Sequence, residues 1–157
     1  TKKIGIADGV GYIISQLIGA VAAAATLKAI LPELGAKVNF ATQGGPSDLI
    51  NNSIGSGFAI EAVLTFFLVT VIFMVAVHKK ASPGLHGFAI GGMVFLIHLV
   101  AVPLTGASVN PARTFGPALI SGFWEFHWLY WAAPILGGII AGLIMNYVYV
   151  KPAEKEA

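Results

Sequence analysis

Four long apolar runs constrain this chain more than any other feature of its sequence. They cover residues 9–30, 57–77, 85–104 and 128–150. An apolar run of about 20 residues is long enough to cross the hydrocarbon core of a bilayer as a helix. Only helices and closed barrels satisfy every backbone N–H and C=O group at that depth. The sequence therefore predicts an all-α membrane protein, one domain over residues 1–157, with four spanning helices.

Composition supports this prediction and excludes several function classes. Hydrophobic residues make up 57% of the chain and charged residues 10%, whereas charged residues approach about a quarter of a soluble domain. The formal net charge is +2 and the basic residues form no stripe, which argues against a nucleic-acid partner. There is no cysteine and no catalytic, metal-binding or phosphate-binding motif. We therefore expect no enzyme activity, no metal and no cofactor.

The lysines orient the four spans. If all four cross, six lysines fall on one side of the membrane, and lysine-rich connections mark the cytoplasmic side. The sequence thus predicts a cytoplasmic C-terminus and an outer loop over residues 31–56. Near the outer start of the last span lie four aromatic residues that an outer interfacial belt would contain: Trp124, Trp128, Tyr130 and Trp131.

A fifth stretch, residues 111–121, is helix-like but only half long enough to span. Asn110 is a good N-cap and Pro111 costs no hydrogen bond at the first helical position. If this stretch spanned, the C-terminal lysines would move outside, so we predict a re-entrant half-helix. Its N-terminus points to the membrane midplane and carries about half a positive charge there. Arg113 is the only arginine and is expected to face water or a partner.

Three of the other polar residues within the spans are candidate site residues. His98 lies in the third span, and a lone histidine there is more often a packed, hydrogen-bonded group than a ligand. Glu61 and Gln16 need partners in lipid. Glu61 is either a proton relay or an acceptor for backbone N–H groups of an irregular loop. The absence of a second titrating group beside it favours the acceptor role.

The first and last spans share a pattern. In the first span, Tyr12 is followed by Gln16 after four residues and by Gly19 after seven. In the last span, Tyr130 is likewise followed after seven residues by a Gly-Gly pair. Small residues at such spacing allow close helix packing in lipid, and this general property is one explanation. The other is an inverted-topology repeat, because the two spans run in opposite directions. In that case the counterpart of the half-helix precedes Thr1.

Residues 98–118, HLVAVPLTGASVNPARTFGPA, resemble the aquaporin (major intrinsic protein) family, in its water-selective type. The resemblance covers essentially the whole chain and corresponds to the C-terminal two-thirds of that family. It implies a right-handed helix bundle in which the four spans match the third to sixth helices. The family's first two helices and first half-helix are missing from this sequence.

The resemblance also implies roles for particular residues. They fall into a pore motif, a selectivity filter, a row of carbonyl groups lining the pore, and residues that support the loop. The pore motif is Asn110, Pro111 and Ala112, and the selectivity filter is His98, Ala107 and Arg113. The pore-lining carbonyl groups belong to Gly106, Ala107 and Ser108, and the loop-supporting residues are Gln16 and Glu61.

The function that the resemblance implies is a passive water channel in the plasma membrane. Protons would be excluded by the half-helix dipole and the His98–Arg113 constriction. His98 and Thr114 stand where glycerol channels carry a small residue and an acid. The alternatives are a channel for glycerol or ammonia, or a non-conducting structural membrane protein. Expected partners are permeating water, lipid, a homotetramer, and the missing N-terminal half in the same or another chain.

Overall fold

Within residues 1–155, the part that the computed structural model describes, every regular element is helical. Four helical stretches are long and apolar enough to cross a membrane, which confirms the predicted all-α fold with four spans. They are Ile6–Ile30, Ile54–Val77, His86–Thr105 and Leu129–Glu154. The first is α1 and the third is α4. The other two contain segments of wider helix.

Both composite spans widen at the same end of the molecule. The second consists of α3 (Ile54–Ile72) and a π-helical turn, Phe73–Val77. The last begins as α6 (Leu129–Met145) and continues through the π-helical Asn146–Val150. It then extends beyond the expected end at residue 150, because α7 follows without a break.

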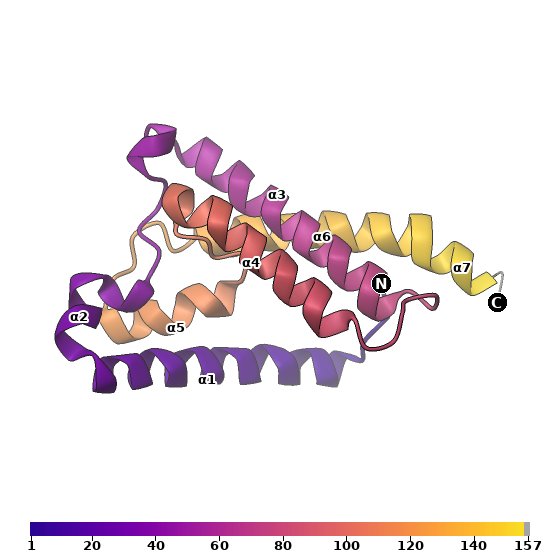
Figure 1. Ribbon diagram of the computed structural model, residues 1–157, viewed down its shortest axis with the longest axis horizontal. Coiled ribbons are helices and arrows are strands. Elements are labelled where there is room, and N and C mark those ends of the chain that lie inside the picture. Colours follow the sequence, from indigo (N-terminus) through magenta and orange to yellow (C-terminus); the bar gives the residue numbers. More distant parts are fainter. Residues whose placement is uncertain (156–157) are drawn as a thin grey trace.

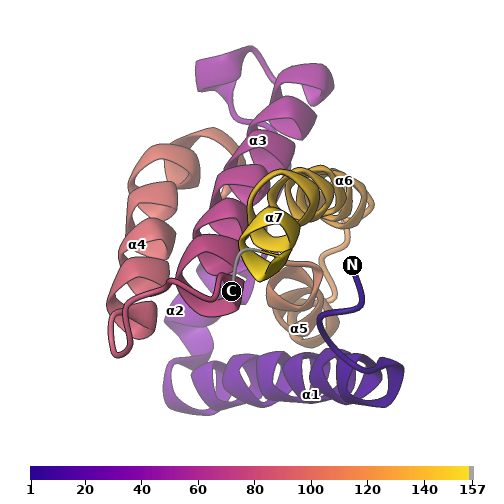
Figure 2. The same cartoon turned by 90° about the vertical axis from the view of Figure 1, so that its right-hand side faces the viewer.

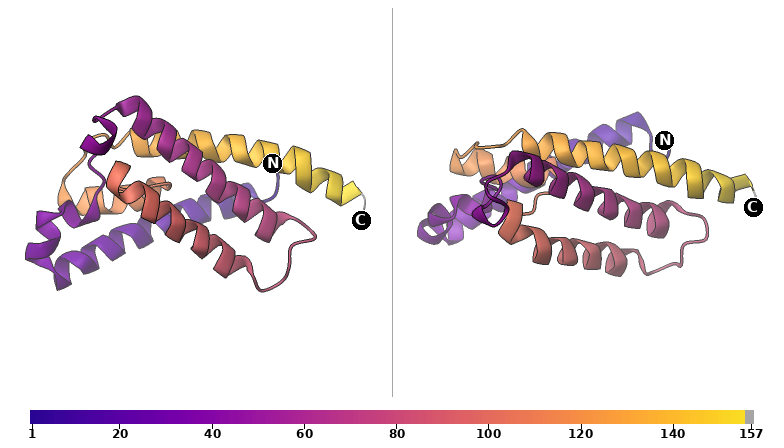
Figure 3. Two further views of the ribbon diagram at one scale, coloured as in Figure 1. Left: turned by 45° about the horizontal axis from the view of Figure 1, so that its top comes forward. Right: turned by 90° about the horizontal axis from the view of Figure 1, so that it is seen from above.

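The spans alternate in direction (Figure 1). α1 and α4 run one way, and α3 and α6 run the other way. One end of the bundle carries the connection between α1 and α3, which includes the short helix α2 (Pro32–Lys37) and two 3-10 turns, Asn39–Ala41 and Asp48–Ile50. The opposite end carries both termini and the turn between α3 and α4 (Figures 1 and 3).

The helix α5 (Pro111–Ser121) does not cross the bundle. Its 11 residues measure about 16 Å, roughly half the thickness of a hydrocarbon core. Figure 1 shows the chain leaving α4 at the end that carries α2, reaching the middle of the bundle, and returning to the same end as α5. The N-terminus of α5 therefore lies at mid-depth.

Glycines stand at two close contacts between helices. A Cβ placed on Gly137 of α6 would lie 2.0 Å from the carbonyl oxygen of Ala62 on α3. A Cβ on Gly116 of α5 would lie 2.3 Å from the backbone of Ala20 on α1. Glycine at these points lets the backbones touch, which is how helices pack tightly in lipid. α5 is thereby held against α1, and α3 against α6.

Candidate functional site: the loop that enters the bundle

The backbone between α4 and α5 is held in a conformation that side chains disfavour. Gly106 has φ +80°, Ala107 +50° and Val109 +47°. A positive φ is rare for a residue with a Cβ and especially for a β-branched one. Each such residue costs about 1–3 kcal/mol and persists only where its surroundings enforce it.

The carboxylate of Glu61 provides that enforcement. Its side chain is fully buried on α3. Oε1 accepts the backbone N–H of Ser108 at 3.0 Å and the hydroxyl of Thr105 at 2.7 Å. Oε2 accepts the N–H of Val109 at 2.7 Å. Hydrogen bonds to an ionised acceptor are stronger than neutral ones, so Glu61 fixes the strained loop from one side.

The connection between α1 and α3, which the lysine distribution predicts to be on the outer side (the outer connection), also holds this loop. The hydroxyl of Tyr130 donates to the carbonyl of Thr105 at 2.6 Å and accepts the N–H of Gly45 at 2.8 Å. Gln43 reaches the carbonyl of Gly106, with 3.5 Å between Nε2 and the oxygen. Tyr130 is completely buried. Its expected place in an interfacial aromatic belt is therefore wrong, because its hydroxyl has partners inside the protein.

Asn110 begins α5. Its side-chain Oδ1 accepts the N–H of Ala112 at 2.9 Å, which satisfies one of the free donors of the first turn. Its Nδ2 donates to Oε1 of Gln16 on α1 at 3.2 Å. Pro111 occupies the next position. The hydroxyls of Ser108 and Thr114 share a hydrogen bond of 2.5 Å.

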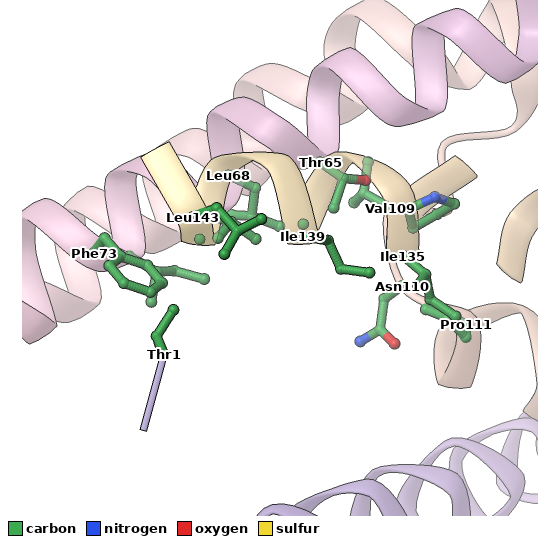
Figure 4. Close-up of a pocket in the computed structure, with 15 residues that line it drawn as sticks. Thr1, Thr65, Leu68, Phe73, Val109, Asn110, Pro111, Ile135, Ile139 and Leu143 are labelled. Atoms are coloured by element: carbon green, nitrogen blue, oxygen red, sulfur yellow. The ribbon is translucent and has the colours of Figure 1, made fainter. Parts of the chain in front are cut away.

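An open groove of about 600 Å³ runs beside Asn110 and Pro111. Its walls come from α3 and α6, with Ile135, Ile139 and Leu143 along one side (Figure 4). The amide of Asn110 extends into this mostly apolar space. The structure thus places a polar side chain and the positive end of a half-helix at mid-depth beside a groove.

Arg113 lies in the first turn of α5 and turns toward the outer end. Its guanidinium donates from Nη1 to the carbonyl of Ala41 at 2.7 Å, and it lies within electrostatic range of Glu61. It also lines a small pocket with Ala20 and Ala24 of α1. The cation is therefore held by the outer connection on one side and influenced by the buried carboxylate on the other.

His98 is not joined to Arg113 by any described hydrogen bond. Its Nδ1 is 2.8 Å from the carbonyl oxygen of Val94, one turn earlier on α4. Ala107 and Ser108 are buried. The structure thus connects Glu61, Ser108 and Asn110 with Gln16 through hydrogen bonds, and leaves His98 bonded to its own helix.

Sequence reasoning missed the contributions of the outer connection. Ala41, Gln43 and Gly45 hold Arg113, Gly106 and Tyr130, respectively. Two of these contacts use the backbone groups of Ala41 and Gly45, and the amino-acid type does not reveal a backbone contact. The Gly44-Gly45 pair is the one available signal: Gly45 has φ +97° and a Cβ there would lie 2.3 Å from the Phe126 ring.

Comparison with known proteins supplies the family. The model of the major intrinsic protein family matches residues 1–145. Aquaporin-4 of Rattus norvegicus is 40% identical over 156 residues, which cover 98% of this chain and 47% of that protein. Aquaporin-8 of Mus musculus is 38% identical, covering 86% and 51%. Aquaporin-7 of Botryotinia fuckeliana (strain B05.10) is 41% identical, covering 94% and 31%. The chain spans about half the length of the first of these relatives.

Proposed function

The chain belongs to the major intrinsic protein (aquaporin) family and is a multi-pass membrane protein, and from this we propose that it forms part of a passive water channel. The observation that carries the proposal is the end of α5 at mid-depth, where the Asn110 amide extends into an open groove. The relatives named aquaporin support the same class. A channel of this kind is not an enzyme.

Water passes the site by exchanging hydrogen bonds. The Nδ2 group of Asn110 is already oriented by Gln16 and by the cap that Oδ1 makes, so it offers a donor in a fixed direction. The carbonyls of Gly106, Ala107 and Ser108 offer acceptors along the entering loop. Because Glu61 holds the strained loop in place, it also fixes the direction in which these carbonyl groups point. Irregular backbone at this depth persists beside water or within protein.

Protons are repelled by fixed positive charge. The α5 N-terminus contributes about half a charge at mid-depth, and Arg113 adds a full charge nearer the outer mouth. Arg113 is held in place by the Ala41 carbonyl, so a hydronium ion meets fixed positive charge at both points. Glu61 is buried and its two oxygens are engaged with the loop, which leaves it as a structural acceptor and not a proton relay.

Selectivity for water over glycerol rests on the outer constriction that we assign to His98, Ala107 and Arg113. The test is stopped-flow light scattering on proteoliposomes, with water and glycerol gradients measured separately. We expect water flux without glycerol uptake, and glycerol uptake after the double substitution His98→Ala, Arg113→Ala. Glycerol uptake by the unsubstituted protein would favour the broader solute channel. Ammonia flux is measured in the same vesicles with a pH-sensitive dye.

The pore is completed by an N-terminal half, in the same or another chain. The shared pattern of α1 and α6 pairs Gly19 with Gly137 and Ala20 with Gly138. Ala20 touches α5 and Gly137 touches α3, but Gly138 lines the open groove and a Cβ on Gly19 would touch nothing. α1 thus packs on a half-helix but has no spanning helix against Gly19, whereas α6 packs on a spanning helix but has no half-helix against Gly138. The N-terminal half would supply both missing partners, a spanning helix against Gly19 and a half-helix against Gly138.

The intact mass of the purified channel tests this completion. We expect either a polypeptide longer than 16.3 kDa or a second polypeptide that copurifies. A conducting assembly of this mass alone would contradict it. We further propose a homotetramer in the plasma membrane. We also place its C-terminus in the cytoplasm, an orientation that the lysine distribution supports.

A further inference from the structure

Three lysines from separate segments converge at the inner end of the bundle. Lys3 lies before α1, Lys79 in the turn between α3 and α4, and Lys151 at the start of α7 (Lys151–Lys155). The Nζ of Lys3 donates to Oε1 of Glu154 at 2.5 Å. Lys79 and Lys151 lie within electrostatic range of the same carboxylate. Figure 2 looks onto this end, where the three segments lie together.

Positive charge at this cluster exceeds its internal compensation. Within residues 1–155, Lys3 pairs with Glu154 and the ammonium groups of Lys79 and Lys151 act on the same carboxylate, so positive charge exceeds negative charge among these four groups. Lysines on the cytoplasmic side are enough to orient a membrane protein. Orientation does not require that lysines from three segments meet around one carboxylate. The convergence therefore calls for a ligand of opposite charge.

An exposed apolar stripe on the last span leads to the cluster. Ile144, Tyr147 and Val148 are 41%, 58% and 57% exposed. The Nζ of Lys151 lies 4.1 Å from the centroid of the Tyr147 ring. Tyrosine favours the boundary between hydrocarbon and headgroups, which would put the stripe beside acyl chains and the lysines in the headgroup layer. A soluble anion would use the lysines but not the stripe.

We propose that Lys3, Lys79 and Lys151, together with the Tyr147 stripe, bind an anionic phospholipid of the cytoplasmic leaflet. The lipid phosphate is held by the lysine ammonium groups, and its acyl chains lie along Ile144 and Val148. Glu154 opposes binding by occupying Lys3. The headgroup class is one with a net negative charge, such as phosphatidylglycerol or phosphatidylserine.

Native mass spectrometry of the detergent-solubilised protein, expressed with any sequence that naturally adjoins it, measures the affinity. The probes are phosphatidylglycerol and the zwitterionic phosphatidylcholine. We expect tighter binding of phosphatidylglycerol. Each lysine near a membrane surface is worth about a fivefold change in affinity for anionic lipid, so Lys79→Gln weakens binding by about that factor. Glu154→Gln releases Lys3 and strengthens it. The control Lys37→Gln removes an equal charge at the outer end and changes nothing.

Several outcomes would overturn the proposal. Equal binding of the two lipids excludes a charge-selective site. Equal effects of Lys79→Gln and Lys37→Gln mean that only net charge matters. Inorganic phosphate that displaces phosphatidylglycerol at equal concentration points to a free-anion site instead of a lipid site. Because Lys79 and Glu154 are exposed, melting temperatures of these variants should equal that of the unsubstituted protein, which excludes misfolding as the cause.

Discussion

Replacing Glu61 with glutamine tests the link between the buried carboxylate and the entering loop. The side chain keeps its size but has one oxygen instead of two. With that oxygen at the Oε1 position, the bonds to Thr105 and Ser108 survive. The new NH2 group then faces the N–H of Val109, which Oε2 accepts in the parent at 2.7 Å. Two donors oppose each other in a fully buried site.

The cost follows from that single lost contact. A hydrogen bond to a charged group contributes about 1.5–3 kcal/mol, and leaving its buried donor unpaired costs a similar amount. Allowing for partial relaxation of the loop, we expect a loss of about 2–3 kcal/mol. At about 2–4 °C for each kcal/mol in a protein of this size, the melting temperature falls by about 4–12 °C. Val109, released from φ +47°, no longer fixes Asn110, and water permeability falls severalfold.

The assay combines melting in detergent, followed by tryptophan fluorescence, with stopped-flow water permeability in vesicles. Glu33→Gln is the matched control, because it makes the same chemical change at an exposed position in the first turn of α2. It should alter neither quantity. If Glu61→Gln has the melting temperature and permeability of the parent protein, the carboxylate does not enforce the loop and the reasoning is wrong.

Three further substitutions probe the supports of the site. Tyr130→Phe removes the hydroxyl that joins the outer connection to the end of α4; it should lower stability by about 1–2 kcal/mol, whereas Tyr147→Phe, at an exposed ring, should not. Gly116→Val drives a side chain into the α1 backbone; it should abolish water flux, while Gly55→Ala, which meets nothing within 4 Å, leaves flux unchanged. Burial lowers the pKa of His127 below its ordinary value, and its Nε2 accepts the indole N–H of Trp131. As the pH falls through about 6.5, His127 therefore takes up a proton more readily in the unfolded chain than in the folded chain, which lowers the stability of the fold. Melting temperature should drop between pH 7 and pH 5 more steeply than in His127→Gln, and parallel slopes would refute this.

The spans and the family were accessible from the sequence because lipid imposes simple rules. A run such as residues 85–104 has no stable alternative to a helix at membrane depth. The 11 residues of α5 are too few to cross, and the cap and proline at Asn110 and Pro111 mark where the helix starts. The motif around them identified the family, which the comparisons confirm.

The supports of the loop were less accessible because they depend on backbone groups and on distant segments. Nothing in the local sequence indicates that the carbonyl of Ala41 accepts a bond from Arg113, 72 residues away. Tyr130 is an aromatic residue close in sequence to Trp124 and Trp128, which are exposed, yet Tyr130 is buried. The roles of His98 and Arg113 in selecting solutes stay predictions, because they concern permeation and not packing.

Osmotic water permeability of the intact protein in proteoliposomes, measured over a range of temperatures, tests the water-channel proposal most directly. We expect shrinkage much faster than in empty vesicles, with a low activation energy, because the proposal has water cross by exchanging hydrogen bonds at Asn110 and the loop carbonyls. Arg113→Ala, His98→Ala vesicles should remain water-permeable and gain glycerol uptake. Shrinkage equal to that of empty vesicles, with the protein intact and correctly inserted, would contradict the account and favour a non-conducting structural role.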